Sequence, residues 1–174
     1  MALWDSNRRQ NCAVMPNKSL TVEQVVALLA ESPGRIAALA ADLAPSQLNA
    51  KPGEDAWSAN DILAHLRACA DVWGDCMKRI LNEDWPTIRA LNPLTRINQT
   101  DYREQGFKPS LRAFATQREE LMAVLEPLDR EAWSRAGTVT GAGRELERSV
   151  LFYGRWMAGH ERTHLKQIER LPRP

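Results

Sequence analysis

The C-terminal stretch of residues 145–171 reads ELERSVLFYGRWMAGHERTHLKQIERL, and it carries the clearest helical pattern of the chain. Apolar and aromatic residues recur along it at spacings of three and four, which predicts one long helix with a buried seam that ends before Pro172. Such spacing, sustained over this length, is typical of a helical bundle. The seam consists of Leu146, Val150, Tyr153, Met157, His160, His164, Ile168 and Leu171.

Three earlier stretches show the same spacing, and no strand-like alternation of useful length competes with them. Each begins where a helix start is expected, at a capping residue or just after a proline. The sequence therefore predicts an all-α four-helix bundle. The predicted helices are residues 21–43, opened by a Thr21–Gln24 capping box and kinked or briefly interrupted at Pro33-Gly34; residues 58–80, capped by Ser58; residues 110–128, after Pro109; and residues 145–171.

The chain has only three histidines, and all of them fall on predicted core-facing seams. His160 and His164 share one face of the last helix, because they are one turn apart, and His65 lies on the seam of the second helix. Buried imidazoles need partners for their ring nitrogens, and a shared divalent metal would supply one to each. Three histidines with an open fourth position can hold a catalytic metal, with zinc or nickel as the first candidates and iron as another.

This metal hypothesis constrains the order of the helices. His65 lies roughly 10 Å from the start of its helix, and His164 lies about as far from the end of the last one, at about 1.5 Å per residue. The histidines can therefore meet only if the second and fourth helices run antiparallel. An up-down-down-up bundle meets this condition but needs a long crossover between the second and third helices. Residues 83–108, EDWPTIRALNPLTRINQTDYREQGFK, supply such a segment, rich in turn-forming residues.

Two blocks taken together, WSANDILAHL at 57–66 and GHERTHLKQI at 159–168, resemble the DinB-like superfamily. The resemblance covers nearly the whole chain after residue 19 and includes WSR at 133–135, which is similar to the family's link into its last helix. It implies an up-down-down-up bundle with a three-histidine divalent metal site, often in a homodimer. His65, His160 and His164 fall on the metal-ligand positions of the family.

The resemblance also implies a function. Relatives include S-transferases that use low-molecular-weight thiols, and maleylpyruvate isomerases. We therefore expect a divalent-metal-dependent enzyme that acts on a small molecule, such as a thiol S-transferase or a related thiol-dependent transferase or isomerase. Two alternatives stay open. One is a non-catalytic metal-binding stress-response or interaction protein, whose structural metal would need a fourth protein ligand. The other is a metal-dependent hydrolase, if the metal binds water instead of a thiol.

Residues 160–164, HERTH, also fit the H-E-x-x-H motif of zinc proteases, in which the glutamate is the general base. Such proteases usually draw a third ligand from further along the chain, but no histidine follows His164. Glu161 lies about 100° around the helix from His160, which predicts a place at the surface or at a dimer edge. The motif therefore favours the bundle site over a peptidase.

Three other side chains are predicted to lie near the histidines, although none stands out as a general acid or base. Asp61, one turn before His65, could support a ligand imidazole or act only at the helix start. Cys69, one turn after His65, could approach the metal or serve as a small core residue. Tyr153, two turns before His160, could line a pocket or pack in the core.

Composition excludes several classes of protein. A chain of 174 residues with a net charge of +1 is sized for one domain and lacks the basic footprint of a nucleic-acid binder. Its three cysteines argue against a disulfide scaffold and for the reducing cytoplasm. No segment is predicted to be a signal peptide or a membrane span. Residues 1–18 lack periodicity and are predicted to form a flexible arm before a bundle domain at 19–174.

Overall fold

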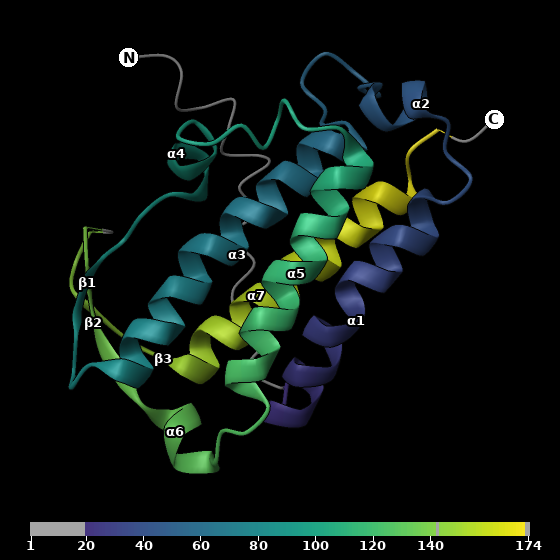
Figure 1. Cartoon of the computed structure of the whole chain (residues 1–174). Coiled ribbons are helices and arrows are strands. Elements are labelled where there is room, and N and C mark those ends of the chain that lie inside the picture. The colour runs from purple at the N-terminus through teal and green to yellow at the C-terminus, as the bar shows by residue number, and fades with distance from the viewer. Residues whose placement is uncertain (1–19, 142, 173–174) are drawn as a thin grey trace.

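Four long helices dominate the computed structural model, which describes residues 20–141 and 143–172 (Figure 1). They are α1 (Val22–Ala40), α3 (Ala59–Asn82), α5 (Phe107–Leu125) and α7 (Val150–Glu169). Three short helices lie in the connections between them: α2 (Pro45–Asn49), α4 (Pro93–Ile97) and α6 (Arg130–Ser134). None of the helices in this part of the chain is long and apolar enough to cross a membrane. The predicted N-terminal arm lies outside the described residues.

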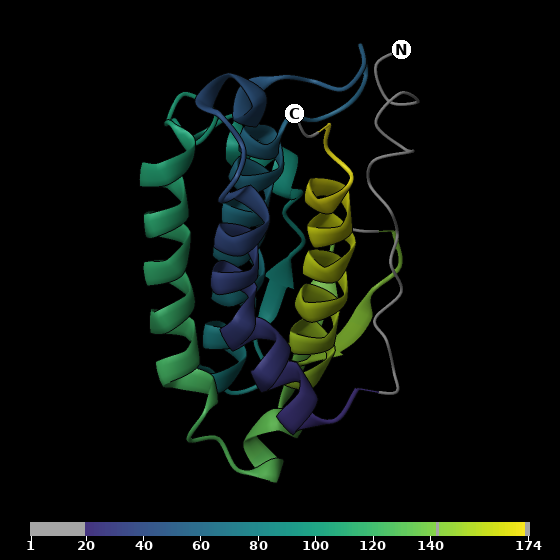
Figure 2. The same cartoon turned by 90° about the vertical axis from the view of Figure 1, so that its right-hand side faces the viewer.

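Helices α1 and α7 run in one direction and α3 and α5 in the other, as two views at right angles show (Figures 1 and 2). Helix α7 packs against α1 and α3, and α5 packs against the same two helices. The predicted up-down-down-up four-helix bundle is therefore confirmed. Because α3 and α7 are antiparallel neighbours, side chains near the start of α3 meet side chains near the end of α7.

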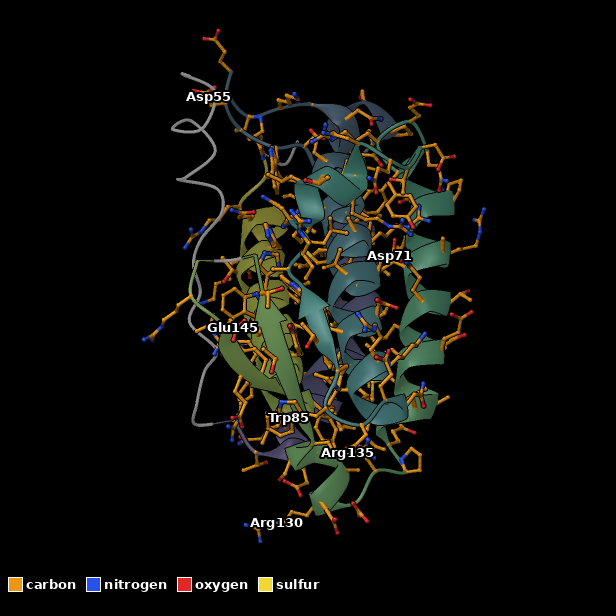
Figure 3. The ribbon with its side chains drawn as sticks, turned by 90° about the vertical axis from the view of Figure 1, so that its left-hand side faces the viewer. Asp55, Asp71, Trp85, Arg130, Arg135 and Glu145 are labelled. Carbon is orange, nitrogen blue, oxygen red and sulfur yellow. The ribbon has the colours of Figure 1, made fainter. Side chains whose placement is uncertain are left out.

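Residues 83–106 join the parallel helices α3 and α5, and they carry the chain back along the outside of the bundle (Figure 1). One carboxylate of α3 holds much of this segment in place. The carboxylate is that of Asp71, which is labelled in Figure 3. It accepts hydrogen bonds from Arg96 Nε at 3.1 Å and from the Tyr102 hydroxyl at 2.8 Å, and it also accepts one from Gln117 of α5 at 2.5 Å. The segment is thus fixed against both helices that it connects.

A small three-stranded sheet covers one side of the bundle, which the sequence did not predict. It consists of β1 (Thr87–Arg89), β2 (Ala136–Thr140) and β3 (Leu146–Ser149), with β1 and β2 parallel and β2 and β3 antiparallel. Leu146–Ser149, predicted as the first turn of the last helix, is therefore a strand. Strands of three to five residues are too short for their alternation to stand out against a helical pattern.

Other helix boundaries also differ from the prediction. Helix α7 begins at Val150, where the Ser149 hydroxyl accepts a hydrogen bond from the Phe152 amide at 3.1 Å. Helix α5 begins at Phe107 instead of Ser110, because a proline in the first turn removes no hydrogen bond that the helix needs. Helix α1 continues through Pro33 without a break, since packing against two neighbouring helices outweighs the one hydrogen bond lost.

The apolar core forms two clusters. The first lies toward α6 and the sheet and includes Trp133, and the second lies toward α2 and includes Leu48. Along α3 the second cluster ends at Leu66, and along α7 the first cluster ends at Ala158. All three histidines lie in the polar layer between the two clusters, in contact with one another. Full burial of one large apolar side chain contributes about 1.5–3 kcal/mol, so both clusters hold this layer firmly.

Candidate metal centre

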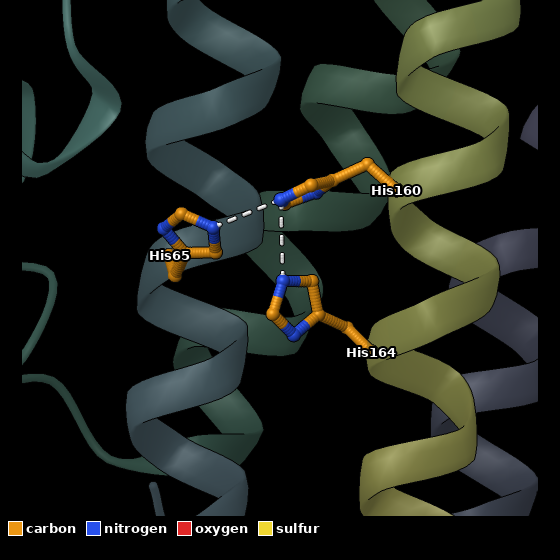
Figure 4. Close-up of side chains that lie close together, drawn as sticks. All are labelled: His65, His160 and His164. Carbon is orange, nitrogen blue, oxygen red and sulfur yellow. Dashed lines mark hydrogen bonds between the residues drawn. The ribbon is translucent and has the colours of Figure 1, made fainter. Parts of the chain in front are cut away.

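Three histidine side chains converge in the polar layer between α3 and α7 (Figure 4). His160 Nε2 lies 3.2 Å from His65 Nε2 and 3.3 Å from His164 Nε2. All three residues are buried, with exposed fractions of 2–4%. The two histidines of α7 reach the same point because they are one turn apart, and His65 reaches it because α3 runs antiparallel to α7.

Burial keeps these imidazoles neutral. It lowers the pKa from the ordinary 6.5 to about 3 for His65, about 2 for His160 and about 4 for His164. Mutual repulsion of their positive forms adds to the effect on His65 and His160. At neutral pH each ring therefore has one nitrogen with a free lone pair, which is the form that binds metal ions.

The hydrogen-bonding capacity of the cluster fits a cation better than it fits three rings alone. His160 Nε2 faces the Nε2 atoms of both other histidines at once. A neutral imidazole has one donor and one acceptor nitrogen, so these rings cannot all be satisfied by one another. Three imidazole nitrogens facing one point are a donor set that zinc and other divalent transition metals bind.

Gln167, which sequence reasoning missed, orients one of these rings. Its Oε1 lies 2.7 Å from His164 Nδ1, and because an amide oxygen only accepts, Nδ1 carries the proton. The lone pair of His164 is then on Nε2, which faces the other two histidines. The signal that could have found Gln167 is its spacing of three residues after His164 on the same helix.

Two tryptophans flank the cluster. The Trp57 ring lies 4.8 Å from the His65 ring and stacks on His164 at 5.8 Å, with 13° between the ring planes. The Trp73 ring meets His160 edge-on at 4.9 Å. Their place on two sides of the histidines gives the centre an apolar surround that excludes water.

Comparison with models of protein families shows the family to which the chain belongs. Residues 28–168 match the model of the DinB superfamily. The chain belongs to this superfamily. Among solved structures it is similar to YfiT from Bacillus subtilis, "a probable metal-dependent hydrolase with an unusual four-helix bundle topology", with a TM-score of 0.76, 18% identity, and 90% of each chain covered. At this identity the likeness shows the fold alone. A comparison with curated proteins finds no match.

Cys69 lies beside the histidines of this DinB-superfamily chain but outside the set that converges. Its Sγ is 3.5 Å from His65 Nε2. In the described part of the chain, only the three histidines form a group of three or more metal-binding side chains whose ligand atoms all lie within 4.8 Å of one another. Burial also raises the pKa of the Cys69 thiol. Among the described residues, this geometry leaves a fourth ligand position without a protein ligand.

The two other predicted neighbours lie elsewhere. Asp61 accepts hydrogen bonds from the Ser58 amide at 3.1 Å and the Ser58 hydroxyl at 2.8 Å, so it acts at the start of α3. Tyr153 is buried in the apolar cluster near the sheet, where burial and the neighbouring Cys76 raise the pKa of its phenol. The structure therefore brings the histidines and Cys69 together, and it gives Asp61 and Tyr153 other contacts.

The prediction that Glu161 lies at the surface or a dimer edge is wrong. Glu161 is 2% exposed and forms an ion pair with the equally buried Arg118 of α5. A position about 100° around α7 from His160 still faces the core, because α7 has neighbours on two sides. A sequence signal was available, since Arg118 lies between Phe114 and Leu121 on the apolar seam of α5. Paired in this way, Glu161 does not serve as the base of a protease motif.

Proposed function

We propose that this protein is a divalent-metal-dependent enzyme in which His65, His160 and His164 hold the ion, and that its co-substrate is a small thiol. The activity would be that of a low-molecular-weight-thiol S-transferase or a related thiol-dependent transferase or isomerase. One observation carries the proposal: three buried, neutral imidazoles face one point, and no fourth protein ligand among the described residues joins them. We propose zinc or nickel as the ion, and iron as a further candidate.

The residues of the chain have separate parts in this proposal. The histidines supply neutral nitrogens, and Gln167 sets the orientation of His164. Trp57 and Trp73 exclude water from two sides, which strengthens electrostatic interactions inside the centre. A divalent ion bound there would lower the pKa of a thiol or a water molecule and so supply a nucleophile at neutral pH.

A thiol fits this centre better than water does. Hydrolysis at a metal usually uses a second side chain to move protons, and the nearest glutamate on α7, Glu161, is buried and paired with Arg118. A thiol needs no such base, because its pKa is already closer to neutrality. The second candidate is a metal-dependent hydrolase, which the description of YfiT favours. A third is a non-catalytic metal-binding stress-response or interaction protein, in which Cys69 moves to close the fourth position.

The first experiment is elemental analysis of the purified protein beside a His160→Ala/His164→Ala variant. We expect close to one equivalent of metal per chain in the wild type and none in the variant. Cys69→Ala should keep its metal and its fold, and loss of either would instead support the closed structural site. Absence of metal even after reconstitution with zinc and nickel would rule out the enzyme proposal.

The second experiment separates transferase from hydrolase. The metal-loaded protein is given 1-chloro-2,4-dinitrobenzene with 2-mercaptoethanol, and separately 4-nitrophenyl acetate. In the first reaction a carbon–sulfur bond forms, chloride leaves and the thiol proton passes to solvent. Metal-dependent acceleration of this reaction alone supports the thiol proposal, whereas acceleration of ester hydrolysis alone supports the hydrolase. We also propose a homodimer, which sedimentation velocity tests directly.

A further inference from the structure

A small cavity lies where the end of α7 meets the start of α3 and the loop that precedes it, at the end of the bundle that carries α2 (Figure 1). Its volume is about 200 Å³. Pockets for drug-sized molecules measure roughly 300–1,000 Å³, so this cavity suits a smaller ligand. Most of its lining is apolar and comes from Pro52, Ala56, Trp57, Ile62 and Leu171.

Two polar side chains complete the lining, and both offer hydrogen-bond donors. The oxygen of Gln167 is engaged with His164, whereas its amide nitrogen has no partner among the described residues. Arg170 has donors only, and no carboxylate in the described part of the chain lies within ion-pair distance of it. Both side chains are exposed, so a ligand can reach them from solvent.

This chemistry selects the ligand. An apolar lining with two donor groups, one of them a cation, is complementary to an apolar molecule that ends in a carboxylate. The last carbonyl groups of α7 carry partial negative charge, which disfavours an anion at this end of the helix. The guanidinium of Arg170 offsets that charge, so we expect this side chain to decide whether an anion binds.

The same cavity adjoins the two side chains that position His164. The Trp57 ring stacks on the His164 ring at 5.8 Å between centres, and Gln167 Oε1 lies 2.7 Å from His164 Nδ1. A carboxylate that accepts a hydrogen bond from Gln167 Nε2 polarises the amide and makes its oxygen a stronger acceptor. A stronger acceptor at Nδ1 orients the imidazole and raises the basicity of Nε2, which faces the other histidines.

We propose that this cavity is a regulatory site for a small apolar carboxylate, which Arg170 and Gln167 bind, and that the bound ligand strengthens metal binding at the three histidines. The ligand acts from the Nδ1 side of His164, so it leaves the fourth ligand position unoccupied. Binding of the carboxylate goes beyond the proposed function and does not require it. The effect on the metal rests on the proposed function.

The test uses benzoate, a small apolar carboxylate, and its neutral analogue benzamide as probes. Their binding to the metal-free protein in EDTA is measured by isothermal titration calorimetry. The variants are Arg170→Met, Arg170→Lys and, as a matched control, Arg162→Met on α7, which lines a different groove. Both arginines are exposed, so neither change should disturb folding. Zinc affinity is then measured by chelator competition with and without benzoate.

We expect benzoate to bind the wild type and benzamide to bind about tenfold more weakly. Arg170→Met should weaken benzoate binding about tenfold, the effect of one charge-assisted interaction, and leave benzamide binding unchanged. Arg170→Lys should retain part of the preference, and Arg162→Met all of it. Absence of benzoate binding to the wild type, or an unchanged ratio of the two Kd values in Arg170→Met, overturns the inference.

Bound benzoate should raise the zinc affinity of the wild type about fivefold, the lower end of typical coupling between two sites, and that of Arg170→Met much less. The variant separates this effect from any contact of benzoate with zinc itself. An unchanged zinc affinity in the wild type overturns the regulatory role. Failure of the wild type to bind zinc at all overturns the proposed function and the regulatory role together, whereas calorimetry on the metal-free protein still decides whether the cavity binds a carboxylate.

Discussion

The buried ion pair between Arg118 and Glu161 gives a prediction whose size follows from the structure. Both side chains are almost fully buried, at 2% and 3% exposure. Removal of one partner leaves the other charge in the core without compensation, which costs about 3–5 kcal/mol. We therefore expect Arg118→Met and Glu161→Met each to lower the free energy of unfolding by about this amount. The double variant, which buries no charge, should lose far less than the sum of the two.

The two single variants should also differ in their pH dependence. Burial already raises the pKa of the Glu161 carboxyl, and only Arg118 and Ser32 oppose this effect. In Arg118→Met the carboxyl can take up a proton and become neutral, so the loss of stability should shrink from pH 8 to pH 5. In Glu161→Met the guanidinium cannot lose its proton in this range, so the loss should stay constant.

The assay is urea unfolding followed by circular dichroism, with EDTA present so that metal binding does not contribute. The control is the exposed pair of Arg79 and Glu83, which lies on the outside of the bundle. Its substitution by methionine should change stability far less, because water screens the charges. Single-variant losses below about 1 kcal/mol, or a double variant equal to the sum of the singles, would show that the pair is not a coupled buried unit.

Three further predictions follow from the site and the core. Gln167→Leu should weaken zinc binding about 10- to 100-fold in a chelator competition, because His164 loses the partner that orients its ring. An unchanged zinc affinity would mean that packing alone fixes the orientation of the His164 ring. In EDTA, the free energy of unfolding should fall as pH drops from 6.5 toward 4, because the imidazoles of the unfolded chain take up protons before the buried ones do. The fall is at most about 1.4 kcal/mol per histidine per pH unit. Urea titrations that show equal stability across this range would contradict the lowered pKa values. Gly154→Ala should lower the free energy of unfolding by about 1–3 kcal/mol, because the new Cβ would lie 2.9 Å from Val25 Cγ1. Gly34→Ala, whose Cβ would meet nothing within 4 Å, should be neutral or stabilising. Thermal melts of the two variants and the wild type compare these effects.

The helices and the identity of the central cluster could be predicted from the sequence. Apolar spacing along residues 145–171 reports which side of a helix is buried, and this information is local. The hypothesis of a shared metal required α3 and α7 to be antiparallel, because only then do the distances of the histidines from the helix ends let them meet, and the structure has this arrangement. Periodicity and helix length are properties of the chain itself, so no tertiary information was needed to find them.

What only the tertiary structure decided involves partners far apart in sequence. Glu161 was predicted at the surface because rotation around one helix says nothing about how many neighbours that helix has, and Arg118 supplies its partner from α5. The strand Leu146–Ser149 depends on β2, and the backbone at Gln105 is held by the Asn60 amide. Hydrogen bonds and ion pairs between distant segments form only once the bundle brings them together. A local pattern can therefore predict the helices and the three histidines, but the surroundings of the metal centre are fixed by packing.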